Sequence, residues 1–558
     1  MFLSTGLAQR QRSRRVPRMG TAQIPAPTRG LNLHDGIAAM KPDDALILDN
    51  WFPEATYLRV RGGTTSHVTG LGSAVQSLME WAGPSSRKMF GATATAIYDV
   101  TSAGAVGAAA VSGLTNGYWQ TTSMTTAGGS FLILCNGSDS VRNYDGTTWT
   151  TPSITGVTSS TLNFVCSHKS RLWFVENNST KAWYLPTSSI AGAAQGFELG
   201  ERFTNGGKLI AIGTVSRDGG AGSDDFLAFI SSHGQVAVFQ GSDPASANTW
   251  DLVGVYNNAP PIGNRSTVGV DGDLAILTES AIVSVRQLMS GGESTANRQA
   301  ISNRIDQGII AAFSSYGALS GWQCATYPRY RMAVFNVPTS ADTAFQYVVN
   351  TQTGAWCTFG LIASPLDATC WGILNEAPYF GTDDGTVFAA ESGYSDLTPQ
   401  LLNFVNNTGG TLQFQNNTLA NLFFVVNPAA GAITAELKTS FQNYGSAGSL
   451  DRITMARGLF TAGAQVVPAI RINVDYRDDQ PMTTDQYPLS AGATGGVWDV
   501  SLWDVGVWGA SEVPYANWVS VTGIGTVASL HMLTSTNGFA CKLNAFDLLY
   551  EMSQARAL

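Results

Sequence analysis

The sequence predicts an all-β protein, and its composition is the first reason. Charged residues make up 13% of the chain, about half the ~25% that is usual in globular proteins. Glycine occurs 60 times and aromatic residues account for 10%. Helical surfaces are normally built from Lys, Glu and Arg, whereas short strands and tight turns use Thr, Ser, Asn and Gly. The hydrophobic share of 44% excludes a disordered chain, and 558 residues correspond to roughly three to four domains.

The charge is distributed unevenly along the chain. The protein has 31 basic and 40 acidic residues, a net charge of −9. Its first 34 residues contain six arginines and no acid, which leaves 25 basic against 40 acidic residues, or −15, for the rest. An acidic body repels nucleic acid, whereas an arginine-rich arm attracts it. We therefore predict a flexible arm over 1–29, with these candidate contacts for a partner or for DNA: Arg10, Arg12, Arg14, Arg15 and Arg18.

An arginine-rich and acid-free N-terminus is also typical of an organellar transit peptide. The proline-containing run 23–27 favours an extended tether instead. The weak apolar stretch precedes the arginines, which is the reverse of the order in a secretory signal. No apolar run approaches the ~18 residues of a membrane helix, so we predict no membrane span.

Between 75 and 400, short apolar strands alternate with polar turns, as in 131–149, 171–185 and 228–239. Such hairpins recur at uneven intervals of roughly 40 to 60 residues, close to the blade length of a β-propeller. A propeller also removes exposed sheet edges, which a chain with few charged residues needs. We predict a β-propeller-like domain over 75–400, with stacked sandwiches as the rival arrangement. Residues 30–74 read as a lead-in of strands and a short helix beginning at Lys41–Asp44.

A second β domain is predicted over 401–558. The runs 435–441 and 469–476 alternate with a period of two, which is typical of half-buried antiparallel strands. The run 498–508 places three tryptophans, Trp498, Trp503 and Trp508, at a spacing that could stack on sugar rings. Burial in a sandwich core is the more common use of tryptophan. We therefore expect a C-terminal antiparallel β-sandwich with strands to about residue 552.

The residue types that carry chemistry are present but scattered. Five histidines lack metal-ligand spacing, six cysteines form no C-x-x-C pair, and no nucleophile elbow or Walker loop occurs. Three acidic pairs lack a calcium-loop spacing and read as turns: Asp43–Asp44, Asp383–Asp384 and Asp478–Asp479. The segment Asp145–Trp149 is similar to the Asp-box of sialidase-type propellers but lacks the residue between Asp and Gly. We predict no catalytic residue, no metal site and no cofactor, and therefore no enzyme.

Several phrases together resemble one family. The segment "GLNLHDGIAAMKPDDALILDNWFPEATYLRVRGG" at 30–63 resembles the N-termini of tail nozzle or tail-hub proteins of short-tailed bacteriophages. The phrases "YVVNTQTGAWCTF" at 347–359, "YFGTDDGTVFAA" at 379–390 and "WDVSLWDVGVWG" at 498–509 are similar to strands of the same group. In that family a strand, an "A…DNW.P" helix and an "R.G" strand precede a β-propeller.

The resemblance implies a structural role in the virion. Usually six copies form a tube below the portal and its adaptor, which extends the channel for double-stranded DNA, retains the packaged genome and anchors tail fibres or a plug. Assembly would take place in the cytoplasm of the bacterial host. A body with 7 lysines and a net charge of −15 would let DNA slide past it. Two alternatives remain open: a glycan-binding or glycan-cleaving propeller tail protein, and a cellular β-propeller scaffold.

Overall fold

The computed structural model describes residues 18–218, 223–270, 272–298, 300–362, 364–401, 414–415, 421–422, 425–444, 449–477, 490–491 and 512–556. Strands dominate this part of the chain, which contains only two α-helices, α1 (Val285–Arg298) and α2 (Asp306–Tyr316). No helix in these ranges is long and apolar enough to cross a membrane. The all-β prediction is confirmed.

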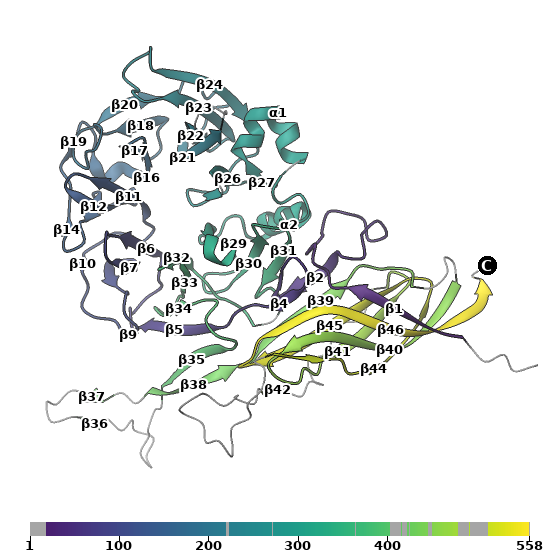
Figure 1. The fold of residues 1–558 in the computed structure, drawn as a ribbon. Coiled ribbons are helices and arrows are strands. Elements are labelled where there is room, and N and C mark those ends of the chain that lie inside the picture. Colours follow the sequence, from purple (N-terminus) through teal and green to yellow (C-terminus); the bar gives the residue numbers. More distant parts are fainter. Residues whose placement is uncertain are drawn as a thin grey trace, which may run out of the picture.

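Seven sheets in the described residues surround a common axis and form the propeller ring (Figure 1). The first four blades, each from its innermost strand outwards, are: β6 (Ser77–Ala82), β7 (Arg87–Ala92), β8 (Ala96–Asp99) and β10 (Val111–Ser112); β11 (Gln120–Thr126), β12 (Gly129–Cys135), β13 (Arg142–Tyr144) and β14 (Trp149–Thr150); β16 (Leu162–His168), β17 (Arg171–Glu176), β18 (Lys181–Tyr184) and β20 (Gln195–Glu198); β21 (Leu209–Asp218), β22 (Ser223–Ser231), β23 (Gln235–Gly241) and β24 (Trp250–Asn257). The β-propeller prediction is confirmed.

The last three blades complete the ring. They are: β25 (Thr267–Val270), β26 (Asp273–Leu277) and β27 (Ile282–Ser284); β28 (Gln323–Tyr327), β29 (Met332–Pro338), β30 (Ala344–Asn350) and β31 (Trp356–Phe359); β32 (Cys370–Leu374), β33 (Ala377–Gly381), β34 (Val387–Ala389) and β5 (Thr64–Thr69). The outer strand of blade 7 comes from far upstream, since β5 pairs antiparallel with β34. The innermost strands β32 and β6 then pack together and close the ring.

Apolar side chains fill the spaces between adjacent blades. Separate buried clusters join blades 1 and 2, blades 2 and 3, and blades 3 to 5. In the last of these, Trp173 stacks on Trp250 with ring centroids 5.6 Å apart. Each alternating apolar strand face is therefore buried against the next blade, which explains why short period-two runs sufficed to build this region.

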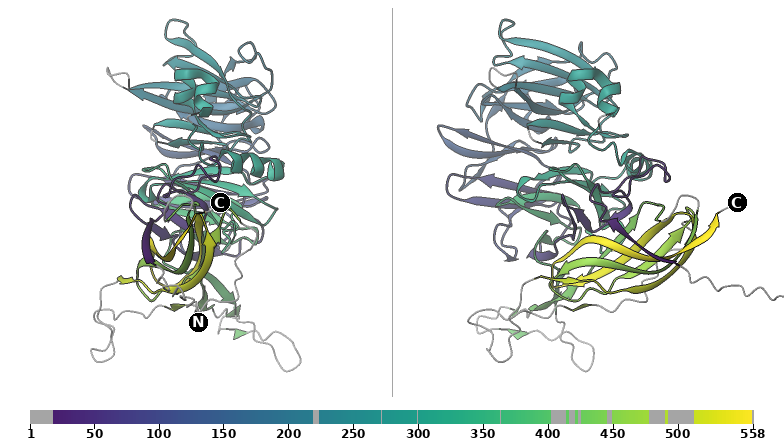
Figure 2. Two further views of the ribbon diagram at one scale, coloured as in Figure 1. Left: turned by 90° about the vertical axis from the view of Figure 1, so that its right-hand side faces the viewer. Right: turned by 45° about the vertical axis from the view of Figure 1, so that its right-hand side comes forward.

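A β-sandwich lies against the edge of the ring formed by blades 6 and 7 (Figure 2). One sheet contains β1 (Arg18–Pro25), β3 (Trp51–Pro53), β4 (Leu58–Val60), β46 (Cys541–Arg556), β40 (Ser449–Ala462), β43 (Val513–Tyr515) and β44 (Val519–Gly525). The other contains β2 (Ala45–Asp49), β39 (Ile433–Thr439), β45 (Ala528–Asn537), β41 (Ala469–Val474) and β42 (Ser490–Ala491).

Propeller and sandwich share continuous sheets. Strand β31 of blade 6 pairs with β2, which pairs in turn with β39. Blade 7 extends through β5 to β35 (Asp396–Leu401) and β38 (Val425–Gly431). The remaining short elements are β9 (Gly104–Ala105), β15 (Ile154–Thr155), β19 (Gly192–Ala193), β36 (Phe414–Gln415), β37 (Asn421–Leu422) and the 3₁₀ turns Ser159–Thr161 and Pro328–Tyr330.

Three expectations for the N-terminal part are wrong. Residues 18–25, assigned above to the flexible arm, form β1 and pair along their whole length with β46, and Ile24 is buried. No helix begins at Lys41–Asp44, because the buried Asp44 carboxylate accepts the Lys41 amide and holds a turn there. Segment 30–74 is also not a lead-in to one domain, because it supplies β2, β3 and β4 to the sandwich and β5 to the propeller.

Candidate functional site: the joint between propeller and sandwich

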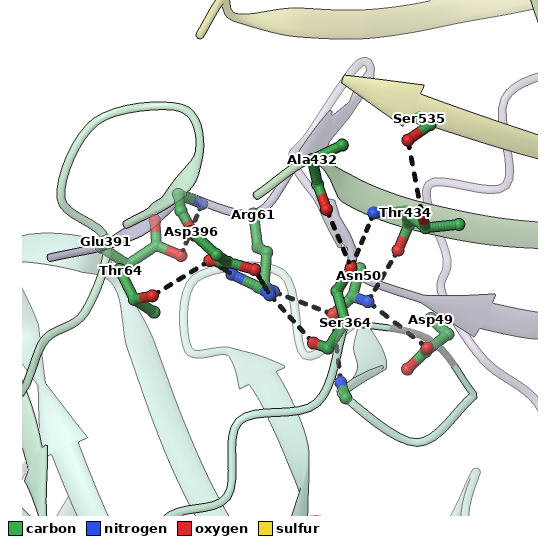
Figure 3. Close-up of polar contacts among 12 residues, drawn as sticks. Asp49, Asn50, Arg61, Thr64, Ser364, Glu391, Asp396, Ala432, Thr434 and Ser535 are labelled. Carbon is green, nitrogen blue, oxygen red and sulfur yellow. Dashed lines mark hydrogen bonds and ion pairs between the residues drawn. The ribbon is translucent and has the colours of Figure 1, made fainter. Parts of the chain in front are cut away.

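Two parts of the 30–63 segment that carries the family resemblance meet where the propeller joins the sandwich (Figure 3). The phrase at 498–509 lies outside the described residues. We call the following set the joint: Asp49, Asn50, Arg59, Arg61, Gly62, Gly63, Glu391 and Asp396. Asp49 and Asn50 belong to the "DNW.P" phrase, and Arg61, Gly62 and Gly63 to the "RVRGG" phrase. Glu391 and Asp396 lie more than 300 residues downstream, Glu391 between β34 and β35 and Asp396 as the first residue of β35.

Asp49 and Asn50 connect the end of β2 to blade 6. Oδ1 of Asp49 accepts hydrogen bonds from Thr358 Oγ1 at 2.8 Å and Leu361 N at 3.1 Å. Asn50 has a φ of 59°, a left-handed conformation that asparagine adopts more readily than most residues. Its Oδ1 accepts the amide of Gly360 at 3.0 Å, and its Nδ2 donates to the carbonyl of Thr434 at 2.8 Å. One side chain thus contacts both the propeller and the sandwich.

Arg61 is the central cation of the joint and is 1% exposed. It forms a two-point ion pair with Asp396, Nη1–Oδ1 at 2.9 Å and Nη2–Oδ2 at 2.7 Å. Its Nε donates to Asn50 Oδ1 at 2.9 Å, and the remaining two N–H groups reach carbonyl oxygens of Gly62 and Ser364, each at 3.0 Å. All five donors of the guanidinium therefore have acceptors, which is the condition for burying such a charge.

Arg59 and the two glycines complete the joint. Arg59 Nη1 lies 2.8 Å from Glu391 Oε2, and its guanidinium lies over the Phe52 ring at 4.5 Å. Burial disfavours the charge of Arg59, but Glu391 and Glu54 outweigh burial and raise its pKa. A Cβ on Gly62 would lie 2.6 Å from the Glu391 Cα, and a Cβ on Gly63 would lie 2.0 Å from the Ser395 carbonyl oxygen. The backbones approach too closely for any side chain at either position.

The chemistry available at the joint is that of a structural connection. A cavity of about 320 Å³ lies beside it, and each charged side chain that lines the cavity has an ion-pair partner within the protein; that of Arg61 is Asp396. Arg59 pairs with Glu391, and Lys542 Nζ lies 2.6 Å from Glu512 Oε2. With its charges compensated inside the protein, the joint fixes the position of the propeller on the sandwich.

The arginines predicted as contacts fall at or before the start of the described chain. Arg10, Arg12, Arg14 and Arg15 lie outside the described residues. Arg18 is the first residue of β1 and pairs in register with Met552, at the end of the sandwich that lies away from the propeller (Figure 1). The residues Trp498, Trp503 and Trp508 and the pair Asp478–Asp479 also lie outside the described part.

The other singled-out acids occupy turns. Asp145 accepts the backbone amides of Thr147 and Thr148 at 2.8 and 2.7 Å, and these bonds lower its pKa. Asp384 accepts the amide of Thr386 at 3.0 Å. In the described ranges no three His, Cys, Asp or Glu side chains are placed to hold a metal ion.

Comparisons with known proteins find only distant structural neighbours. No family model and no curated protein matches it. Virginiamycin B lyase from Staphylococcus aureus is similar in structure, with a TM-score of 0.35, 11% identity and coverage of 59% of this chain and 97% of that one. YCF48 bound to D1 peptide has a TM-score of 0.35 and 8% identity, with coverage of 62% of this chain and 98% of that one. BamB from Moraxella catarrhalis has a TM-score of 0.30 and 12% identity, with coverage of 61% of this chain and 93% of that one. Likeness at this level carries no argument about function.

Proposed function

We propose that the protein is the tail nozzle of a short-tailed bacteriophage. In this proposal six copies form an oligomeric ring that extends the DNA channel below the portal and adaptor. The ring retains the packaged double-stranded DNA and anchors tail fibres or a plug.

One observation supports this proposal above the others. The phrases that resemble nozzle proteins, "DNW.P" and "RVRGG", supply the joint that fixes propeller to sandwich. The resemblance therefore lies in residues that hold the two domains together, as expected for a protein whose role is structural. A fixed two-domain unit also suits a tube that must keep its shape while DNA passes through it.

The charge of the chain supports the channel role. The body beyond residue 34 carries a net charge of −15, and a channel of that sign repels DNA and lets it slide. The arginines at positions 10, 12, 14, 15 and 18 are proposed to contact the acidic surface of an adaptor or the DNA phosphates. Since β1 starts at Arg18, these contacts would form at the end of the sandwich away from the propeller.

The proposal is tested by assembly. The full chain is mixed with the portal and adaptor proteins encoded beside its gene, and the products are imaged by electron microscopy. We expect a ring of six copies attached to the adaptor, with an electronegative bore. A chain that stays monomeric in the presence of both partners would contradict the nozzle role and favour a cellular scaffold.

The arm is tested by deletion of residues 1–17, which leaves β1 intact. We expect unchanged stability but weaker docking to the portal–adaptor complex, with a smaller dependence on salt concentration. Deletion of 1–29 is not a usable substitute because it removes β1. Equal docking of truncated and full-length protein at low and high salt would exclude a contact by the arm.

A further inference from the structure

A polar pocket of about 400 Å³ opens at the mouth of the propeller ring. Its lining comes from the starts of four innermost strands: Gln120 opens β11, Asn163 lies in β16, Arg265 precedes β25, and Trp322 precedes β28. We call it the mouth pocket. Innermost strands of a propeller run in the same direction around the axis, so their starts meet on one face of the ring.

The charge of the mouth pocket is opposite to that of the protein. Among the described residues no Asp or Glu lines it, although the chain contains 40 acidic residues, and Arg265 is the only charged lining residue in that part of the chain. The Arg265 guanidinium donates to the carbonyl of Gln76 at 2.8 Å, to the carbonyl of Trp119 at 3.1 Å and to the hydroxyl of Ser77. Among the described residues it has no carboxylate partner, and burial lowers its pKa.

Arg265 retains donors for a ligand. A guanidinium has five N–H groups, and the contacts with Gln76, Trp119 and Ser77 use three of them. Its Nε–H and one Nη1–H have no acceptor in the described part of the chain. Both fork edges of a guanidinium include Nη2, whose two N–H groups are in use, so the free Nε–H and Nη1–H can each donate a single hydrogen bond to an anion. An arginine with free donors and no carboxylate partner among the described residues is suited to bind a carboxylate in this one-point way.

Neutral amides and an aromatic ring surround this cation. The side chains of Gln120 and Asn264 line the pocket and form no hydrogen bond within the described residues. The Oδ1 atom of Asn163 is buried without a partner. Tyr118 is 40% exposed, and Arg265 lies over its ring at 5.5 Å. Amide groups that both donate and accept suit hydroxyl groups, and an exposed aromatic face suits the apolar face of a sugar ring.

We propose that the mouth pocket binds an acidic sugar, with its carboxylate on Arg265 and its hydroxyl groups on the side chains of Gln120, Asn163 and Asn264. We expect binding without hydrolysis, because most glycoside hydrolases use a pair of carboxylates and the described lining has none. This inference does not rest on the nozzle role. In a tail protein such a site would contact an acidic polysaccharide of the bacterial surface.

The test is calorimetric titration of the full-length protein with glucuronic acid and with N-acetylneuraminic acid. Methyl glucoside serves as the neutral ring and acetate as the carboxylate without a ring. We expect both acidic sugars to bind and to bind at least about ten-fold more tightly than either control, since a hydrogen bond to a charged group is commonly worth a factor of this size. No binding of either acidic sugar, or equal binding of either control, would overturn the proposal.

Variants assign the binding to the pocket. Arg265→Gln should weaken binding about ten-fold or more, whereas Arg202→Gln, at an exposed arginine outside the pocket, should leave it unchanged. Arg265 also contacts blades 1 and 2, so Gln120→Ala provides a second variant whose side chain has no protein partner to lose. A Gln120→Ala protein with wild-type melting temperature and about three-fold or more weaker binding would support the site. Unchanged affinity in both Arg265→Gln and Gln120→Ala would place the binding elsewhere.

Discussion

The joint and the mouth pocket each contain one central arginine, buried in the joint and half-buried in the pocket, and the two arginines differ in what surrounds them. Arg61 has a carboxylate partner and an acceptor for every donor. Arg265 donates to two carbonyls and a hydroxyl, and it has no carboxylate partner in the part of the chain that the structure describes. A buried charge that is fully compensated contributes to structure, and removal of its partner is costly. A charge that the protein leaves uncompensated can be completed by a ligand.

The largest expected effect tests the joint. Asp396→Ala leaves the buried Arg61 charge without its carboxylate, and we expect the free energy of unfolding to fall by about 3–5 kcal/mol. The measurement is denaturation in guanidinium chloride. Asp547→Ala is the matched control, since its partner Arg457, 2.8 Å away, is 31% exposed against 1% for Arg61. This variant should lose ~1 kcal/mol at most. Similar losses for the two variants would show that the joint is an ordinary surface ion pair.

The next effect is a pH dependence of stability that comes from a buried histidine and involves neither arginine. His168 of β16 is 4% exposed, its Nδ1 lies 3.1 Å from Thr214 Oγ1, and burial lowers its pKa from 6.5 to about 4. Between these pH values the unfolded chain binds a proton that the folded protein does not. Stability should therefore fall as the pH drops from 6.5 to 4, by about 3 kcal/mol in total.

Denaturation curves recorded across this pH range measure the effect. His168→Gln should flatten the profile, whereas His233→Gln, at an exposed position, should leave its slope unchanged. A wild-type profile that is flat from pH 6.5 to 4 would contradict the assignment to His168.

A smaller loss is expected from the backbone contact within the joint. Gly63→Ala places a Cβ against the carbonyl of Ser395, which neither backbone can avoid without moving. We expect a loss of about 1–3 kcal/mol, the usual cost of overpacking. Gly36→Ala is the control, because a Cβ there meets no atom within 4 Å. A Gly63→Ala protein as stable as Gly36→Ala would show that the two segments are free to separate.

The parts of the fold that were predictable from sequence are the local ones. Alternating apolar residues and a turn predict hairpins such as 131–149, so the propeller could be predicted from residues that are neighbours in the sequence. The pairing of β5 with β34 and of β1 with β46 joins strands more than 300 residues apart. No local pattern specifies such a partner, so the sequence predicts only a lead-in over 30–74 and an arm that includes 18–25.

The same limit applies to the two sites. The phrases containing Asn50 and Arg61 were visible as a resemblance, but their partner Asp396 lies 335 residues beyond Arg61 and follows no motif. Arg265 had no signal at all, because a single arginine between Asn264 and Ser266 is unremarkable in sequence. Its proposed binding role depends on the absence of acidic side chains from the described lining of the mouth pocket. Only the closed propeller ring brings those lining residues together.

The smallest expected effect is the loss of stability in Arg265→Met, which is compared with the loss in Arg61→Met. Arg61→Met leaves Asp396 and Asn50 without their partner, so it should destabilise strongly, in the range given for Asp396→Ala. Arg265→Met should cost ~1 kcal/mol or less, because the unpaired carbonyls it leaves are offset by removal of an uncompensated charge.

If the mouth pocket binds an acidic sugar, a concentration ten times the Kd should stabilise the wild type by about 1.4 kcal/mol. Thermal unfolding with and without glucuronic acid should show this increment in the wild type and in Arg202→Gln, and not in Arg265→Met. A loss for Arg265→Met as large as that for Arg61→Met, with no ligand increment in the wild type, would make Arg265 a second structural arginine and remove the distinction between the two regions.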